Sequence, residues 1–262
     1  MEPLKSPRYN EKALQGLNVL VTRPSHQVSA LAELIRMCGG NPILFPVIDI
    51  TCLNHDAQAR LEKNKMKSND IAIFLSANAV TCVDILLESL PETIIAIGPG
   101  THNTLINKGI ERAHMPLNYC SEGILDLAVL QHVTGKNIWV FCGCDPREHL
   151  FGVLQQRGAQ VNRLECYRRQ PSQPTLEMIE MVKKAMPDIV ISTSCEGLHN
   201  LQTLIAKHDL FFINTAPMLV VNQKMYDYWQ ANECPSQVLV AENATDQALI
   251  DGLISIVTGG IN

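Results

Sequence analysis

The residues best placed to do chemistry are hydroxyl, amide and glycine residues that follow short apolar segments. Each such segment has the pattern of a buried strand, and a helix pattern begins just after the turn. A turn of this kind presents unpaired backbone N–H groups and the positive end of a helix dipole, which together bind anions such as carboxylates. We expect these turns near Thr22, Ser76, Gly98, Ser121, Gly143, Ser194, Asn222 and Thr245.

Several common catalytic patterns are missing from the chain. The eight histidines are dispersed and show no metal-ligand spacing. Cys142 and Cys144 have one residue between them, where zinc motifs have roughly two to four. Neither a G-x-G-x-x-G nor a P-loop pattern occurs, which disfavours a dinucleotide or P-loop enzyme. We therefore expect no metal site.

The bulk composition is that of a globular protein with two domains. The chain has 262 residues, of which 46% are apolar and 18% charged. No apolar run reaches the ~18 residues that a membrane helix needs. A net charge of −5 and a pI near 5.9 argue against a nucleic-acid surface, but they leave room for a small anionic ligand.

The N-terminus and the cysteines suggest a cytoplasmic protein. Residues 1–17 lack the apolar stretch of a secretion signal, so we expect a loose N-terminal extension. The nine cysteines lie mostly in apolar contexts, which predicts reduced, buried thiols.

An internal repeat predicts the architecture. Asn18–Gly39 resembles Asn137–Gly158, and three further segments recur in the same order at offsets of 118 to 124 residues. In the first copy Val28, Leu31, Ala32 and Ile35 line one helical face, and glycines stand at both expected helix ends. We expect Ser121 and Thr245 to cap the last helix of each copy. The fold class predicted is α/β, with two similar domains, each a parallel sheet flanked by helices.

Two strand-like segments, 41–50 and 161–170, follow the first helix of each copy. The second is unusually charged for a central parallel strand. Such strands can run between domains or inside one, and the sequence leaves that choice open.

Taken together, the motifs resemble the bacterial uroporphyrinogen-III synthase family from about residue 17 to 257. The order and spacing carry the resemblance, since no single motif is specific. The matching motifs are Thr22-Arg23-Pro24, Gly39-Gly40, Leu44-Phe45-Pro46, Ser76–Val80, Gly98-Pro99 with Thr101, Ser121–Gly123, Arg147-Glu148, Tyr167–Arg169, Thr193-Ser194 and Ala241–Thr245.

The resemblance implies a discontinuous domain arrangement. One α/β domain comprises residues 1–43 plus 169–262, and the other comprises residues 47–164. Strands 44–50 and 161–170 form a two-stranded antiparallel linker. In that family the active site is the cleft between the domains.

The resemblance also implies a reaction. The substrate is hydroxymethylbilane, a linear tetrapyrrole polycarboxylate. It loses its hydroxyl as water, the last pyrrole attacks through its substituted carbon, and a spiro intermediate recloses with that ring inverted. No cofactor is needed, and positioning matters more than any single acid or base. We expect a cytoplasmic monomer without nucleic-acid or membrane partners, and a transient contact with the preceding pathway enzyme stays open.

Tyr167 is the expected catalytic residue, because a phenol on the second linker strand can assist protonation of the departing hydroxyl. The alternative is a tyrosine that only packs against its strand. Ser76, Thr101 and Ser194 are expected substrate contacts, and each can instead, or in addition, serve as a helix cap. Ser121 is expected among the same contacts.

The expected substrate contacts also include Gly143, Arg23, Arg147 and Lys224. Arg23 can pair with a substrate propionate or with an internal acid. Arg147 can instead support the first turn of its helix. Lys224 lies in a turn where some family members have Gly-Pro-Thr-Thr. This chain has Asn-Gln-Lys-Met at residues 222–225, so no threonine role is carried over.

Two other readings share the repeat and the anion-binding turns. One is a non-catalytic two-domain cleft protein that binds a small anionic ligand. The other is a synthase-derived regulatory domain without activity, which the altered turn at residues 222–225 keeps open.

Overall fold

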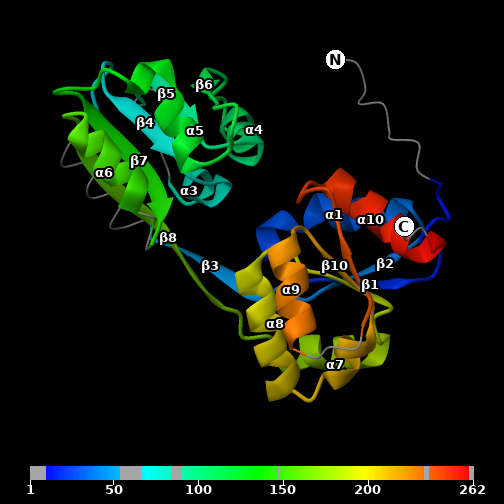
Figure 1. The fold of residues 1–262 in the computed structure, drawn as a ribbon. Coiled ribbons are helices and arrows are strands. Elements are labelled where there is room, and N and C mark those ends of the chain that lie inside the picture. Colours follow the sequence, from blue (N-terminus) through cyan, green and yellow to red (C-terminus); the bar gives the residue numbers. More distant parts are fainter. Residues whose placement is uncertain are drawn as a thin grey trace. The chain divides into compact units, whose positions relative to one another are not determined.

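The chain folds into two α/β units in a computed structural model (Figure 1). The structure describes residues 10–53, 66–83, 90–144, 146, 148–232 and 236–259. Residue contacts divide the chain into Met1–Asp49 with Pro171–Asn262, and Ile50–Gln170. The domain boundaries inferred above, 1–43 plus 169–262 and 47–164, stay a prediction.

The first unit contains a five-stranded sheet in the order β11-β10-β9-β1-β2, in which every pairing is parallel. Its strands are β1 (Asn18–Val21), β2 (Asn41–Leu44), β9 (Ile189–Ile191), β10 (Met218–Val220) and β11 (Val238–Val240). Its helices are α1 (Ser29–Met37), α7 (Leu176–Ala185), α8 (Cys195–Lys207), α9 (Gln223–Ala231) and α10 (Asp246–Thr258), with short 3₁₀ turns at Ser25–Gln27 and Phe211–Thr215.

The second unit contains a six-stranded, mostly parallel sheet in the order β3-β8-β7-β4-β5-β6. Its strands are β3 (Ile48–Cys52), β4 (Ile71–Phe74), β5 (Thr93–Ala96), β6 (Ala113–His114), β7 (Asn137–Gly143) and β8 (Gln160–Pro171). Its helices are α3 (Ala77–Thr81), α4 (Pro99–Asn107), α5 (Ser121–Asp126) and α6 (Glu148–Gln156), with a 3₁₀ turn at Ala128–Leu130.

The repeat seen in the sequence occupies equivalent places in the two sheets. Strands β1, β9 and β10 stand in the first sheet as β7, β4 and β5 stand in the second. The first helix of each copy of the repeat, α1 or α6, ends shortly before a glycine with positive φ. This angle is +84° at Gly39 and +82° at Gly158. The predicted α/β class with two similar sheet-and-helix units is therefore confirmed.

Both faces of the central strands of the second sheet are buried, which explains why β4, β5 and β7 are almost entirely apolar. In β4, Ile71 and Ile73 face one core cluster, whereas Ala72 and Phe74 face the other. Phe74 stacks on Phe141 of β7 with ring centroids 4.4 Å apart. Helices α3 and α4 cover one face, and α5 and α6 cover the other (Figure 1).

The segment 41–50 does not form one continuous strand. β2 ends at Leu44 and β3 begins at Ile48, with Pro46 between them. A proline has no backbone N–H for a ladder, although the amides of Phe45 and Val47 still donate to carbonyls beside β1. The charged segment 161–170 belongs to β8, which pairs in parallel with β7 inside the second sheet.

The expected loose N-terminal extension is wrong for residues 10–17, and the expectation of reduced, buried thiols holds for Cys38, Cys142 and Cys166 but is wrong for one pair of cysteines. Residues 10–17 are not loose, because Leu14 is fully buried and its amide donates to the carbonyl of Cys38 at 2.8 Å. Residues 1–9 lie outside the described residues. Cys52 and Cys82 are not free thiols but form a disulfide with their Cα atoms 5.1 Å apart. No helix in the described part of the chain is long and apolar enough to cross a membrane.

Candidate functional site

The strand-to-helix turns are built around side-chain caps. At several of the expected turns a side-chain oxygen accepts a hydrogen bond from the backbone N–H three residues further on, at 3.0 to 3.3 Å. These residues are Ser76, Ser194, Asn222 and Thr245. The capping role considered for Ser76 and Ser194 is thus present, and their contact with substrate stays a prediction.

The prediction that Ser121 caps its helix is wrong, whereas the same prediction for Thr245 is confirmed. The preceding residue, Cys120, has the extended backbone of an N-cap, and its sulfur accepts from the amide of Gly123 at 3.4 Å. Ser121 is the first residue of α5 and is partly exposed. Serine is a strong capping residue and cysteine is not, so the sequence alone favours Ser121 at this position.

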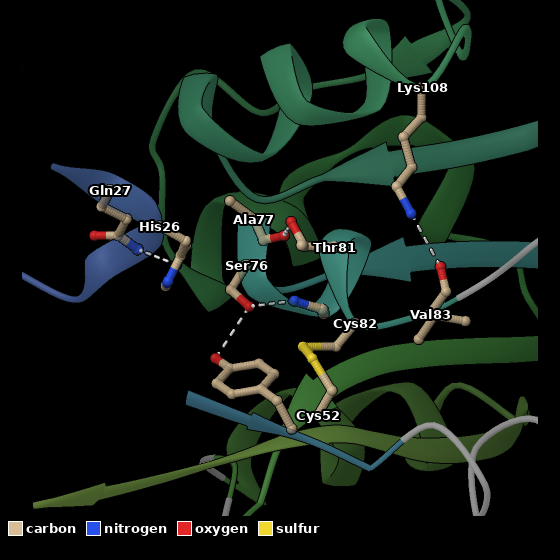
Figure 2. The surroundings of a disulfide bond; sticks show 11 residues. His26, Gln27, Cys52, Ser76, Ala77, Thr81, Cys82, Val83 and Lys108 are labelled. Atoms are coloured by element: carbon tan, nitrogen blue, oxygen red, sulfur yellow. Dashed lines mark hydrogen bonds between the residues drawn. A yellow bond between two sulfur atoms is a disulfide. The ribbon is translucent and has the colours of Figure 1, made fainter. Parts of the chain in front are cut away.

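Tyr167 and Ser76 lie together in the second unit. Ser76 follows β4 and Tyr167 is on β8, and the Ser76 hydroxyl donates to the Tyr167 phenol oxygen at 3.0 Å (Figure 2). Tyr167 is only 4% exposed, and its ring belongs to the core cluster beneath α3 and α4. The packing role and a polar contact therefore occur in one side chain.

The hydrogen bonds at Ser76 orient the phenol. The Ser76 oxygen already accepts from the Ala79 amide at 3.1 Å, so its own proton points to Tyr167. Arg169 also approaches, with a guanidinium nitrogen 3.5 Å from the phenol oxygen. Since both neighbours donate to this oxygen, the phenol proton is directed toward a third acceptor.

Gly143 lies against the Tyr167 ring. A Cβ atom at position 143 would be 2.8 Å from Cζ of Tyr167, closer than two carbon atoms can pack. A register shift in the β7–β8 ladder also occurs between Cys142 and Gly143. The structure thus brings together three predicted site residues, Ser76, Gly143 and Tyr167.

Thr101 lies in the first turn of α4, in the same unit. Its side chain is 4% exposed, and the N-cap of this helix, Gly98, has no side chain that could accept a hydrogen bond. The Tyr119 side chain packs on Gly98, with its Cβ 3.2 Å from where a Gly98 Cβ would lie. The amides of this first turn are not capped by a side chain.

Arg23 pairs with an internal acid, one of the two partners that the sequence allowed. It is 8% exposed, and one guanidinium nitrogen lies 2.5 Å from a carboxylate oxygen of Asp246. A second nitrogen donates to the carbonyl of Ala244. Arg23 thereby ties the end of β1 to the start of α10, and its contact with substrate stays a prediction.

Two of the other predicted contacts, Lys224 and Ser194, belong to the first unit, where they follow the neighbouring parallel strands β10 and β9. Lys224 is exposed in the first turn of α9. Ser194 is the N-cap of α8, and Arg147 lies outside the described residues. No group of three or more metal-ligating side chains could hold a metal ion among the residues that the structure describes.

Sequence reasoning missed two features beside Tyr167. The position of Arg169 over the Tyr167 ring, with Cζ 5.9 Å from the centroid, follows from alternation along β8 and could have been read from the Tyr-Arg-Arg motif. The Cys52–Cys82 disulfide had no local signal, because 30 residues separate the two cysteines.

Comparisons with known sequences find the same family along most of the chain. A sequence model of the family described as uroporphyrinogen-III synthase HemD matches residues 29–251. The uroporphyrinogen-III synthase of Salmonella typhimurium is 27% identical over 248 residues, which is 90% of this chain and all of that one. The Escherichia coli enzyme of the same name is 28% identical with the same coverage.

Solved structures give the same fold. A uroporphyrinogen-III synthetase from Helicobacter pylori aligns with a TM-score of 0.56 at 14% identity, over 92% of this chain and 99% of that one. A mutant uroporphyrinogen III synthase from Thermus thermophilus aligns with a TM-score of 0.55 at 16% identity, over 94% of this chain and all of that one. At this identity the likeness supports the fold alone.

Proposed function

This chain belongs to the uroporphyrinogen-III synthase family, and from that premise we infer that it converts hydroxymethylbilane to uroporphyrinogen III. The observation that carries this function is the family match over residues 29–251, which takes in parts of both α/β units. The reaction is a dehydrating cyclisation with inversion of the last pyrrole ring, so the enzyme is a lyase of tetrapyrrole and haem biosynthesis. The match favours an enzyme over a non-catalytic binding protein.

Tyr167 is the proposed proton donor to the departing hydroxyl. Its phenol oxygen accepts from Ser76 and lies near Arg169, so its proton remains for a substrate oxygen. Loss of the hydroxyl as water requires this proton and leaves an electrophilic azafulvene. Gly143 supports this role because it leaves space for the Tyr167 ring, and a side chain at position 143 would fill that space.

The carboxylates of the substrate are proposed to bind at the strand-to-helix turns. In α4 the cap Gly98 offers no side-chain acceptor, so the first-turn amides and the Thr101 hydroxyl can meet a carboxylate. At Ser76 and Ser194 the side chain satisfies one amide, and further first-turn amides remain. Ser121, Arg23, Arg147 and Lys224 complete the proposed set.

Which ring isomer the enzyme forms then depends more on how the substrate is positioned than on the strength of an acid group. Without an enzyme the bilane closes to the isomer whose last ring is not inverted. The protein has to favour attack by the substituted carbon, and fixed carboxylate contacts do this by restricting the bilane's conformation. We further propose that the chain works as a cytoplasmic monomer on this small-molecule substrate.

The deciding assay supplies hydroxymethylbilane to the purified full chain and separates the two uroporphyrinogen isomers by chromatography. A reaction without protein gives the background of the uninverted isomer. We expect the inverted isomer to become the main product in proportion to protein concentration. If the product remains the uninverted isomer at high protein concentration, the chain is a binding or regulatory relative instead.

A further inference from the structure

The Cys52–Cys82 disulfide joins two elements of the second unit that also meet at Tyr167. Cys52 is the last residue of β3, and Cys82 is the residue that ends α3. Figure 2 shows the disulfide close to Ser76, which begins the same helix. The two ends of α3 are thus held by different means, one by Ser76 and the other by Cys82.

Helix α3 is too short to hold its own position. It comprises Ala77–Thr81, little more than one turn, and helices of this length are not stable by themselves. Its place depends on buried contacts of Asn78, Ala79 and Val80, on the Ser76 cap, and on the covalent bond at Cys82. The covalent bond is the contact that a change in redox conditions can remove.

The contacts form a closed ring. Cys52 is bonded to Cys82, α3 connects Cys82 to Ser76, and Ser76 donates to Tyr167. The ring closes between neighbouring strands, since the residue after Cys52 donates its amide to the carbonyl of Cys166, which precedes Tyr167. Opening the disulfide therefore removes one of the links that set the distance between Ser76 and Tyr167.

We propose that the Cys52–Cys82 pair is a redox-sensitive element that positions Ser76 against Tyr167, so that its reduction lowers turnover. The proposal rests on the function inferred above. Cys52 is an exposed residue whereas Cys82 is 3% exposed, so Cys52 is the cysteine that an external thiol would attack. The lysine Lys108 also donates to the carbonyl of Val83, so reduction loosens this end of α3 without releasing it.

The chemistry is thiol–disulfide exchange with a dithiol reductant. One thiolate of the dithiol attacks the sulfur of Cys52, forming a mixed disulfide, and Cys82 leaves as a thiolate that takes up a proton. The second thiol of the dithiol then attacks its partner sulfur and releases Cys52, which is also protonated. The protein gains two electrons and two protons, and the dithiol becomes a disulfide.

The test compares the full chain after mild oxidation with oxidised glutathione and after reduction with dithiothreitol. Peptide mass spectrometry measures the disulfide, hydrogen exchange measures the amides of residues 76–83, and the isomer assay measures kcat/KM. Reduction should speed exchange in residues 76–83 and lower kcat/KM by about two- to tenfold, the worth of one hydrogen bond. A Cys52→Ser variant should stay at the reduced level in both conditions, whereas Cys120→Ser should keep the response.

Three outcomes overturn the proposal: no disulfide forms on oxidation, exchange in residues 76–83 is the same in both states, or kcat/KM does not change. If the inverted isomer forms in neither state, the inferred function fails. The redox element is then decided by hydrogen exchange alone: faster exchange on reduction supports it, and unchanged exchange overturns it. If Cys52→Ser does not fold, the oxidised and reduced wild-type chains still decide.

Discussion

Replacing Tyr167 by phenylalanine separates the chemical role of the phenol from its packing role. The substitution keeps the buried ring, which is 4% exposed, and removes one oxygen. That oxygen accepts from Ser76 at 3.0 Å, so the Ser76 hydroxyl loses its acceptor while its own oxygen still caps α3. The free energy of unfolding should fall by about 1 kcal/mol.

The kinetic effect should be much larger than the stability effect. Loss of a hydrogen bond alone lowers kcat/KM by no more than about tenfold. A general acid contributes roughly 10²- to 10⁴-fold, so Tyr167→Phe should lower kcat more than a hundredfold and change KM little.

The assay measures initial rates of uroporphyrinogen III formation against hydroxymethylbilane concentration, with urea unfolding of the same samples. Tyr119→Phe is the matched control, because Tyr119 is 58% exposed in the same unit and makes no described hydrogen bond through its hydroxyl. If Tyr167→Phe keeps kcat within tenfold of the wild-type value, the phenol is not the proton donor and the packing role suffices.

Three further predictions concern other features of the two units. Gly143→Ala places a Cβ 2.8 Å from the phenol ring and should lower kcat at least tenfold, whereas Gly152→Ala, which meets no atom within 4 Å, should leave it unchanged; equal rates in steady-state assays would contradict the close packing. Asp246→Asn removes the carboxylate partner of the buried Arg23 and should cost about 2 kcal/mol in urea unfolding, since Asp246 is 31% exposed; an unchanged midpoint would mean that the pair contributes nothing. Burial raises the pKa of Cys142 to about 12, so its thiol stays protonated at pH 8 and should resist iodoacetamide until the chain unfolds; mass-spectrometric detection of labelling in the folded chain would refute this.

The sequence predicted the sheets well because its signals there are local and repeated. Apolar strand patterns, helix faces and the two helix-ending glycines each occur twice in one order, so each copy supports the other. The same reasoning failed at residues 10–17, which are polar in pattern but place Leu14 in the core. One buried residue among polar neighbours gives no periodicity to detect.

The candidate site was only partly predictable. Ser76 and Tyr167 were both named from the sequence, but 91 residues separate them, and no pattern indicated their hydrogen bond. The disulfide was missed for the same reason, because a cysteine pairing depends on how distant segments meet. The cap of α5 was predicted at Ser121 because serine is a preferred capping residue, but the backbone places Cys120 at the N-cap position.

The strand order of the first unit has a consequence for folding during synthesis on the ribosome. β1 emerges early, yet its neighbour β9 follows it by more than a hundred residues, after the whole stretch Ile50–Gln170 has been made. The unit formed by residues 50–170 can therefore fold while the edge of β1 that later pairs with β9 is still unpaired. A nascent chain stalled far enough beyond Pro171 for β8 to have left the ribosome, but before β9 has left it, should hold a complete six-stranded sheet and only β1 and β2 of the other sheet. In that interval a chaperone would find an unpaired strand to protect.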